Sequence, residues 1–421
     1  MKFFRKKNSI YLDYAAAAPL DGDVARLMHA TEELSIANAS AIHAPGVASR
    51  KIIADARSRI AALFHVHPDE IIFTGSGTES DALAIIGVIT NYEPACPADR
   101  LHITDGNQKN KIPHIVTTNI EHPAVLENCR LLEAQGRAEV TYVEVRENGI
   151  VDPKDIKEAL RENTILVSCM YANNEIGTIQ PIRDIAKEIR HFRKSRANSS
   201  FPLFHTDACQ AANYVPMGNM EKLGVDLLSL NGSKIYGPKG IGVLYKKRGV
   251  ALAPLYEGGG QEFGLRPGTE NVSLIAGVAL ALEKAVAVKE KENSRLTQLR
   301  DYGVMKLLHL SGISGYDIVL NGDPKNRLPN NINISISEIS SELLVIELDA
   351  KGIYVSSKSA CKSDEPDESY VIAAVRMAQG KRSDTVDGSL RITLGRQTRR
   401  SDIDALVKNL GRILDTYKKW K

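Results

Sequence analysis

The sequence of 421 residues has no uninterrupted apolar run as long as the roughly 18 residues that a membrane-spanning helix needs. The nearest approach, LIAGVALALEKAVAV, is broken by Glu283 and Lys284, which indicates a buried helix. The two phenylalanines in MKFF are too few for the apolar core of a signal peptide. We therefore expect neither a membrane span nor a secretory leader.

Cysteine is also scarce: there are five, an odd number, and no two of them form a CxxC pair. This usage argues against a disulfide framework, predicts no metal site, and favours a reducing cytoplasm. Cys96, Cys129, Cys169 and Cys209 have apolar or helical neighbours and are expected to be small core residues. Cys361 differs, because its segment KSACKSDEPDES is polar and would leave a thiol accessible.

Charge of one sign does not dominate, since 54 basic side chains stand against 51 acidic ones and the net charge is +3. Neither nucleic acid nor a membrane surface is therefore expected as a partner. Hydrophobic residues make up 43% of the chain and charged residues 25%, a composition typical of a globular protein.

From about residue 47 the pattern alternates between helix and strand. Short apolar runs are separated by helical patterns such as HPAVLENCRLLEAQ, and the runs are EIIFT, HIVTTNI, EVTYVEV, TILVSCMYA, PLFHTDA and VDLLSL. This alternation predicts an α/β fold with a largely parallel sheet. A long helix over roughly 270–310 and a mixed pattern after it predict a smaller α+β part. The four alanines at 15–18 form a run too short to interpret.

Polar residues follow these runs at the edge where parallel sheets bind ligands. GSGTESD offers backbone N–H groups and a helix N-terminus to a phosphate, although a plain helix cap is an alternative. His122 follows HIVTTNI, Asn174 follows TILVSCMYA, and Asp207 ends PLFHTDA. Lys234 in NGSKIYGPKG is either a solvated loop residue or an amine nucleophile. A phosphate cradle, an imidazole, a carboxylate and an amine together are what pyridoxal phosphate requires.

The chain resembles the cysteine desulfurases of the class V aminotransferase family over nearly its whole length. The segments that carry the resemblance are YLDYAAAAP, TGSGTESDALAI, EHPAVLENCR, ANNEIGTIQPI, HTDACQ, SKIYGPKGIGVLY, GGGQEFGLRPGT, VSSKSAC and SLRITLGR. This resemblance implies the pyridoxal-phosphate-dependent transferase fold of type I. A large domain at 21–266 would contain a mostly parallel seven-stranded sheet. Residues 1–20 and 267–421 would form a smaller domain that carries the catalytic cysteine loop.

The resemblance also implies roles for particular residues. Lys234 would be the Schiff-base lysine, Asp207 would face the pyridine nitrogen, and His122 would lie over the ring and assist proton transfer. The remaining cofactor contacts would come from Gly77, Thr78, Asn174, Gln210, Ser233 and, across a subunit boundary, Thr269. Asn38, Asn174 and Arg391 would bind the substrate.

Cys361 would be the sulfur acceptor of the reaction. As a thiolate it would take the sulfur of L-cysteine and leave L-alanine, because a neutral thiol is a poor nucleophile. The resemblance further implies a homodimer with shared active sites. The persulfide would pass to an acceptor protein in iron–sulfur cluster or thio-cofactor assembly.

The sequence departs from the family pattern at Asn231, Ser233, Pro267 and Lys358. The first three change expected phosphate contacts, and Lys358 adds a charge near Cys361 that could lower the pKa of its thiol. Two alternatives therefore stay open. One is a selenocysteine lyase or another lyase of the same superfamily, and the other is a degenerate scaffold that has lost its cofactor.

Overall fold

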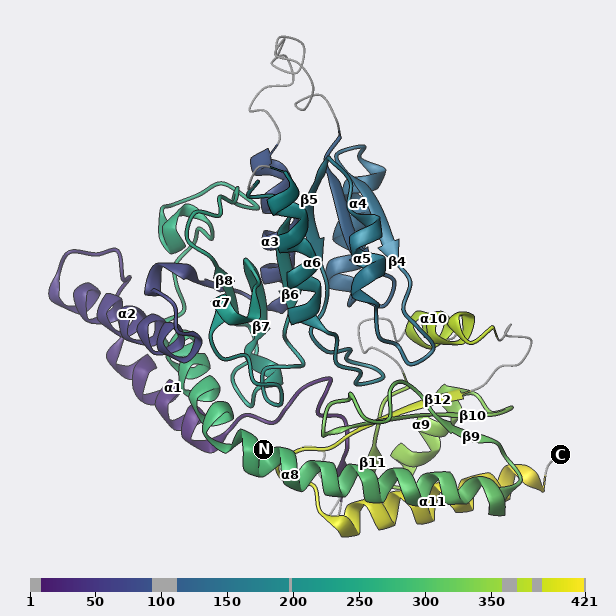
Figure 1. Ribbon diagram of the computed structural model, residues 1–421. Coiled ribbons are helices and arrows are strands. Elements are labelled where there is room, and N and C mark those ends of the chain that lie inside the picture. Colours follow the sequence, from purple (N-terminus) through teal and green to yellow (C-terminus); the bar gives the residue numbers. More distant parts are fainter. Residues whose placement is uncertain (1–8, 93–111, 197–198, 358–368, 381–387, 420–421) are drawn as a thin grey trace.

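The computed structural model describes residues 9–92, 112–196, 199–357, 369–380 and 388–419. Its centre is a seven-stranded sheet, drawn in the upper part of Figure 1. The strand order is β2 (Ile71–Thr74), β8 (Gly242–Lys246), β7 (Leu227–Asn231), β6 (Leu203–Asp207), β5 (Thr164–Ser168), β3 (His114–Thr118) and β4 (Glu139–Val143). Within this sheet β8 runs antiparallel to both of its neighbours, and the other strand pairs are parallel.

Alternate residues of the strands point to opposite faces, because side chains in a strand alternate with a period of two. One face contributes Ile72, Ile115, Leu227 and Leu244 to a hydrophobic cluster with α3 (Gly77–Tyr92) and α4 (Pro123–Ala134). The opposite face contributes Phe73, Val116, Leu228 and Val243 to a larger cluster that includes α6 (Ile182–Ser195). Burial on both faces explains why the predicted strands are continuous apolar runs. The short helices α5 (Pro153–Ala159) and α7 (Met220–Leu223) pack against α6.

A smaller sheet lies below the large one in Figure 1. It is antiparallel, with the order β12 (Gly388–Thr393), β10 (Asn331–Ile336), β9 (Ile318–Leu320). Beside it β1 (Ile10–Tyr11) pairs in parallel with β11 (Ile353–Tyr354), so the start of the described chain packs with its C-terminal part. The helices of this part are α9 (Ser341–Ala350), α10 (Tyr370–Ala378) and α11 (Arg400–Lys418).

One long helix, α8 (Val272–Ser314), runs along the base of the molecule (Figure 1). Its first half packs against α1 (Gly22–Leu34) and α2 (Ala44–Phe64), and further along the helix packs against α11 and β9. None of the helices in the described ranges combines the length and the apolar character that crossing a membrane requires.

The predicted fold class is confirmed: a mostly parallel seven-stranded sheet stands beside a smaller α+β part. All strands of the large sheet come from residues 71–246, inside the predicted 21–266 unit. The division into 21–266 against 1–20 with 267–421 itself stays a prediction.

Candidate active site

The ends of β2, β5, β6 and β7, with the turn after β3, open onto one small cavity of about 140 Å³. Loops leave parallel strands at this edge, so residues far apart in the sequence meet there. Most of the predicted cofactor and substrate residues line this cavity, namely Gly77, Thr78, His122, Asn174, Asp207, Gln210, Lys234 and Arg391. The last of these comes from β12 of the smaller sheet, so both parts of the molecule build the site.

The glycine-rich turn after β2 forms one end of the cavity. Helix α3 starts at Gly77, so its first N–H groups lie at the cavity. A Cβ atom at Gly77 would lie 2.7 Å from Cys209 Sγ and 3.1 Å from Asn231 Cβ. No larger side chain fits, which leaves the backbone open to close approach by an anion.

Asp207 ends β6 and is 6% exposed. One of its carboxylate oxygens, Oδ1, accepts a hydrogen bond of 2.8 Å from the backbone N–H of Cys209. A backbone donor of this kind favours the charged form of a carboxylate. A carboxylate that faces a protonated ring nitrogen needs such support. The thiol of Cys209 also lines the cavity, so the expectation that Cys209 is a core residue was wrong. Burial raises its pKa well above the ordinary value, which makes it a poor nucleophile.

His122 caps α4, with its Nδ1 accepting a hydrogen bond of 3.1 Å from the backbone N–H of Ala124. Burial lowers the pKa of the imidazole, with Asp207 opposing and Lys234 adding to the shift. The ring is therefore neutral at pH 7. Because Nδ1 accepts, the proton of the neutral ring is on Nε2, and the side chain can donate from that atom.

Lys234 lies in a short 3-10 turn, Gly232–Lys234, directly after β7. Its Nζ donates hydrogen bonds to the backbone carbonyls of Ala15, at 2.9 Å, and Ala16, at 2.6 Å. Gln210 Nε2 donates to the same Ala15 carbonyl at 3.0 Å. Ala15 and Ala16, from the four-alanine run that the sequence left uninterpreted, are therefore part of the site.

Arg391 and Asn174 also line the cavity. Arg391 is 1% exposed; its Nη2 lies 2.9 Å from Asp13 Oδ1, and its Nη1 donates to the Asn174 carbonyl at 3.3 Å. Arg391 Nε and Asn174 Oδ1 are buried with no hydrogen-bond partner in the described structure. Unsatisfied polar atoms in a cavity wall point to a polar ligand, because leaving them without a partner is costly.

Three predicted residues lie outside the cavity. The hydroxyl of Ser233 donates to Asn231 Oδ1 at 3.0 Å, so Asn231 rather than Ser233 lines the wall. Asn38 and Thr269 are exposed on the surface of this chain. Cys361 lies outside the described residues, as do Lys358 and Cys96.

Sequence reasoning missed several cavity residues. Asp81 lies one turn into α3 and has the pattern of an ordinary helical residue. Met170 lines the cavity, and its backbone N–H donates to Glu121. Asp13, the partner of Arg391, precedes the alanine run. The order of the segments gives no signal for these contacts, because Asp13 and Arg391 are 378 positions apart and Met170 and Glu121 are 49 apart.

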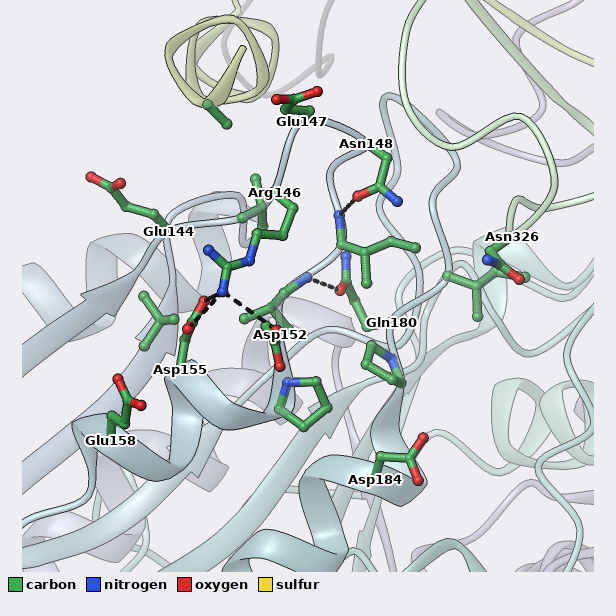
Figure 2. Close-up of a pocket in the computed structure, with 18 of the residues that line it drawn as sticks. Glu144, Arg146, Glu147, Asn148, Asp152, Asp155, Glu158, Gln180, Asp184 and Asn326 are labelled. Atoms are coloured by element: carbon green, nitrogen blue, oxygen red, sulfur yellow. Dashed lines mark hydrogen bonds and ion pairs between the residues drawn. The ribbon is translucent and has the colours of Figure 1, made fainter. Parts of the chain in front are cut away.

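A larger groove of about 1430 Å³ lies elsewhere, beside α5 and α10 (Figure 2). Its walls are acidic, and Arg146 lies among the carboxylates, 2.8 Å from Asp155 and 3.4 Å from Asp152. None of the predicted site residues in the described ranges lines it. The groove is therefore no part of the predicted active site.

The residues of the small cavity fit pyridoxal phosphate. The glycine cradle at Gly77 suits a phosphate, Asp207 suits a ring nitrogen, and the Lys234 amine suits an aldehyde. Together with the sheet order, this arrangement defines a pyridoxal-phosphate-dependent enzyme of fold type I.

Comparison with known proteins identifies the family. The model of the aminotransferase class-V family matches residues 10–406. A cysteine desulfurase, IscS, from Dictyoglomus turgidum is 41% identical over 409 residues, covering 97% of this chain and 95% of the relative. A solved NifS-like protein has a TM-score of 0.83 and 31% identity over 97% of this chain and all of its own. A structure described as SspA in complex with cysteine has a TM-score of 0.71 and 30% identity, covering 92% and 99% of the two chains.

This chain belongs to the aminotransferase class-V family, whose members depend on pyridoxal phosphate. The predicted resemblance to cysteine desulfurases is confirmed.

Proposed function

We propose that this protein converts L-cysteine to L-alanine in the small cavity and carries the released sulfur as a persulfide on Cys361. The activity is that of a cysteine desulfurase, in agreement with the relatives named above. Atoms balance, since the sulfur leaves the substrate Cβ and joins the Cys361 thiol, while a proton takes its place on carbon. The observation that carries the proposal is the convergence of Lys234, Asp207 and Arg391 on one cavity.

When bound, pyridoxal phosphate supplies an aldehyde for an amine and a ring that withdraws electrons from the substrate Cα. Asp207 would face the ring nitrogen, because its nearly buried carboxylate lines the cavity. Gly77 and Thr78 would hold the phosphate at the start of α3. His122 would lie beside the ring, with Nε2–H as a donor.

Arg391 and Asn174 would bind the substrate carboxylate. The guanidinium is already oriented by Asp13, and its Nε has no protein partner in the described structure. A planar guanidinium held in this way can donate two parallel N–H bonds to a carboxylate, which the ammonium group of a lysine cannot do. Lys234 would move the Cα proton, with the carbonyls of Ala15 and Ala16 accepting from its ammonium form.

We further propose a homodimer in which Thr269, and with it Asn38, completes the site of the other subunit. Large apolar side chains are exposed in the same region: Ile42 is 94% exposed and Phe263 is 58% exposed. Phe263 also borders a groove of about 490 Å³ with Ala39 and Ser40. Exposed apolar clusters of this kind mark association surfaces. Sedimentation of the wild type and of Phe263→Asp tests this, and a monomeric wild type contradicts it.

The acceptor of the persulfide and the cytoplasmic location are proposed on the sequence alone. An iron–sulfur scaffold or a sulfur carrier would take the sulfur, and the low cysteine usage agrees with a reducing compartment.

The deciding experiment incubates purified protein with L-cysteine and measures alanine and protein-bound persulfide together. Wild type should form both, and Cys361→Ala should form neither while still changing the cofactor absorbance on addition of cysteine. Alanine formation by Cys361→Ala would instead indicate a lyase that works without this thiol. Protein that stays colourless with added cofactor would indicate a scaffold.

A further inference from the structure

A second carboxyl, that of Asp81, lines the cavity and has no role in the proposed reaction. It lies on α3 one turn after Gly77 and is 1% exposed. Its Oδ1 atom is buried with no hydrogen-bond partner in the described structure. A carboxylate in this position would keep one buried oxygen, Oδ1, without a donor, which is costly.

The nearest basic group is His205 on β6, with its Nε2 3.5 Å from Asp81 Oδ1. The imidazole is engaged by two hydroxyls, since Nδ1 lies 2.9 Å from Ser168 Oγ and Nε2 lies 3.0 Å from Ser229 Oγ. Complete burial lowers the pKa of His205 to about 4, so the ring is neutral at pH 7. The contact is therefore no ion pair, and within the described ranges no lysine or arginine forms one with Asp81.

The other groups that face Asp81 are acidic. Burial raises its pKa most, and the neighbouring carboxyls of Asp207 and Glu121 raise it further, while the Ser229 hydroxyl opposes them. Cys209 packs beside it and is a thiol of raised pKa.

The cationic members of the cavity are directed elsewhere. Lys234 donates to the Ala15 and Ala16 carbonyls, and Arg391 pairs with Asp13. His122 is neutral, as argued above.

Asp81 and Asp207 differ in what stabilises a negative charge. Asp207 accepts a backbone N–H from Cys209 at 2.8 Å, whereas Asp81 Oδ1 has no donor in the described structure. Two buried carboxyls in one cavity cannot both ionise at little cost, so one of them is expected to hold a proton. Of the two, Asp81 is the carboxyl whose surroundings favour the protonated form.

We propose that Asp81 is a positioning residue that holds this proton at neutral pH, so that Asp207 keeps the negative charge that faces the cofactor ring. The neutral acid is then a donor within the cavity, which the bare carboxylate cannot be. This inference rests on the proposed function for its purpose, but not for the protonation state of Asp81.

Infrared spectra of the purified protein, labelled with ¹³C at the aspartate carboxyl, test the protonation state directly. At neutral pH the wild type should show a protonated aspartic acid band. The band should be lost in Asp81→Asn and should persist in Asp207→Asn, because burial is the largest cause of the raised pKa of Asp81 and does not depend on the Asp207 carboxyl. Asp184→Asn, at an exposed carboxyl, is the matched control and should retain the band. A band that is absent from the wild type, or that is lost in Asp207→Asn, overturns the proposal.

Cofactor affinity tests the role, by titration of cofactor-free protein with pyridoxal phosphate. Asparagine keeps a donor in place of the acid, so Asp81→Asn should bind within about threefold of wild type, whereas Asp81→Ala should bind about tenfold or more weakly. If Asp81→Asn binds pyridoxal phosphate as weakly as Asp81→Ala does, the proposed role of Asp81 as a donor is overturned. Where Asp81→Ala does not fold, Asp81→Val replaces it as the variant without a donor. A protein that binds no cofactor in any form contradicts the proposed function but leaves the infrared result standing.

Discussion

Glu121 is a fully buried carboxyl directly before His122. Its Oε1 accepts hydrogen bonds from Thr118 Oγ1, at 2.6 Å, and from the backbone N–H of Met170, at 2.9 Å. These donors favour the charged form, but burial outweighs them and raises the pKa of Glu121 from 4.5 to about 8. The folded protein therefore holds this proton at pH 7, while the unfolded chain releases it.

The sign of the pH dependence follows from this difference. A group whose pKa is raised on folding stabilises the folded state below its unfolded pKa, and that stability is lost as pH rises through the folded pKa. For Glu121 the window is from about 4.5 to about 8. Between pH 6 and pH 9 the free energy of unfolding should fall by roughly 2–3 kcal/mol through this residue alone.

Glu121→Gln removes the titration and keeps a carbonyl oxygen that can accept from Thr118 and Met170. We expect urea unfolding of cofactor-free protein to show that Glu121→Gln loses less free energy of unfolding than wild type does between pH 6 and pH 9. The difference in unfolding free energy between the two proteins should therefore shift in favour of the variant as pH rises. Other titrating groups cancel in this difference. The matched control is Glu127→Gln, at an exposed position on α4. If the difference in unfolding free energy between wild type and Glu121→Gln is the same at pH 6 and at pH 9, the reasoning is refuted.

Further predictions concern the cavity. Arg391→Lys should raise KM for L-cysteine about 10-fold to 100-fold with a smaller change in kcat, because the fork that faces the substrate is lost; steady-state alanine formation measures this, and an unchanged KM contradicts the assignment. Gly77→Ala should weaken pyridoxal phosphate binding about tenfold or more, since its Cβ would lie 2.7 Å from Cys209 Sγ. The double variant with Cys209→Ala should recover part of that affinity in an absorbance titration, and no recovery argues against the steric cause. Lys234→Ala should lose the absorbance of the lysine-linked cofactor, and retention of that absorbance would place the link on another amine.

Much of the cavity follows from local patterns. Apolar runs buried on both faces predict a parallel sheet, and parallel strands bring their carboxyl ends to one edge. His122, Asp207 and Lys234 could therefore be placed together, because each lies within a few residues of a strand end. The glycine-rich turn was predictable for the same reason, and the helix that follows it starts at Gly77.

What the sequence determined by itself is the order of strands and helices, and with it the set of polar side chains at the strand ends. Tertiary structure alone decided the other contacts of the site. The carbonyls of Ala15 and Ala16 reach Lys234 across more than two hundred positions, and backbone acceptors leave no trace in residue type. Asp13 meets Arg391 only where β12 lies beside the start of the chain, and the environment of Asp81 depends on neighbours from β6 and β7. Burial and unpaired atoms are properties of packed neighbours, so they exist only once the chain has folded.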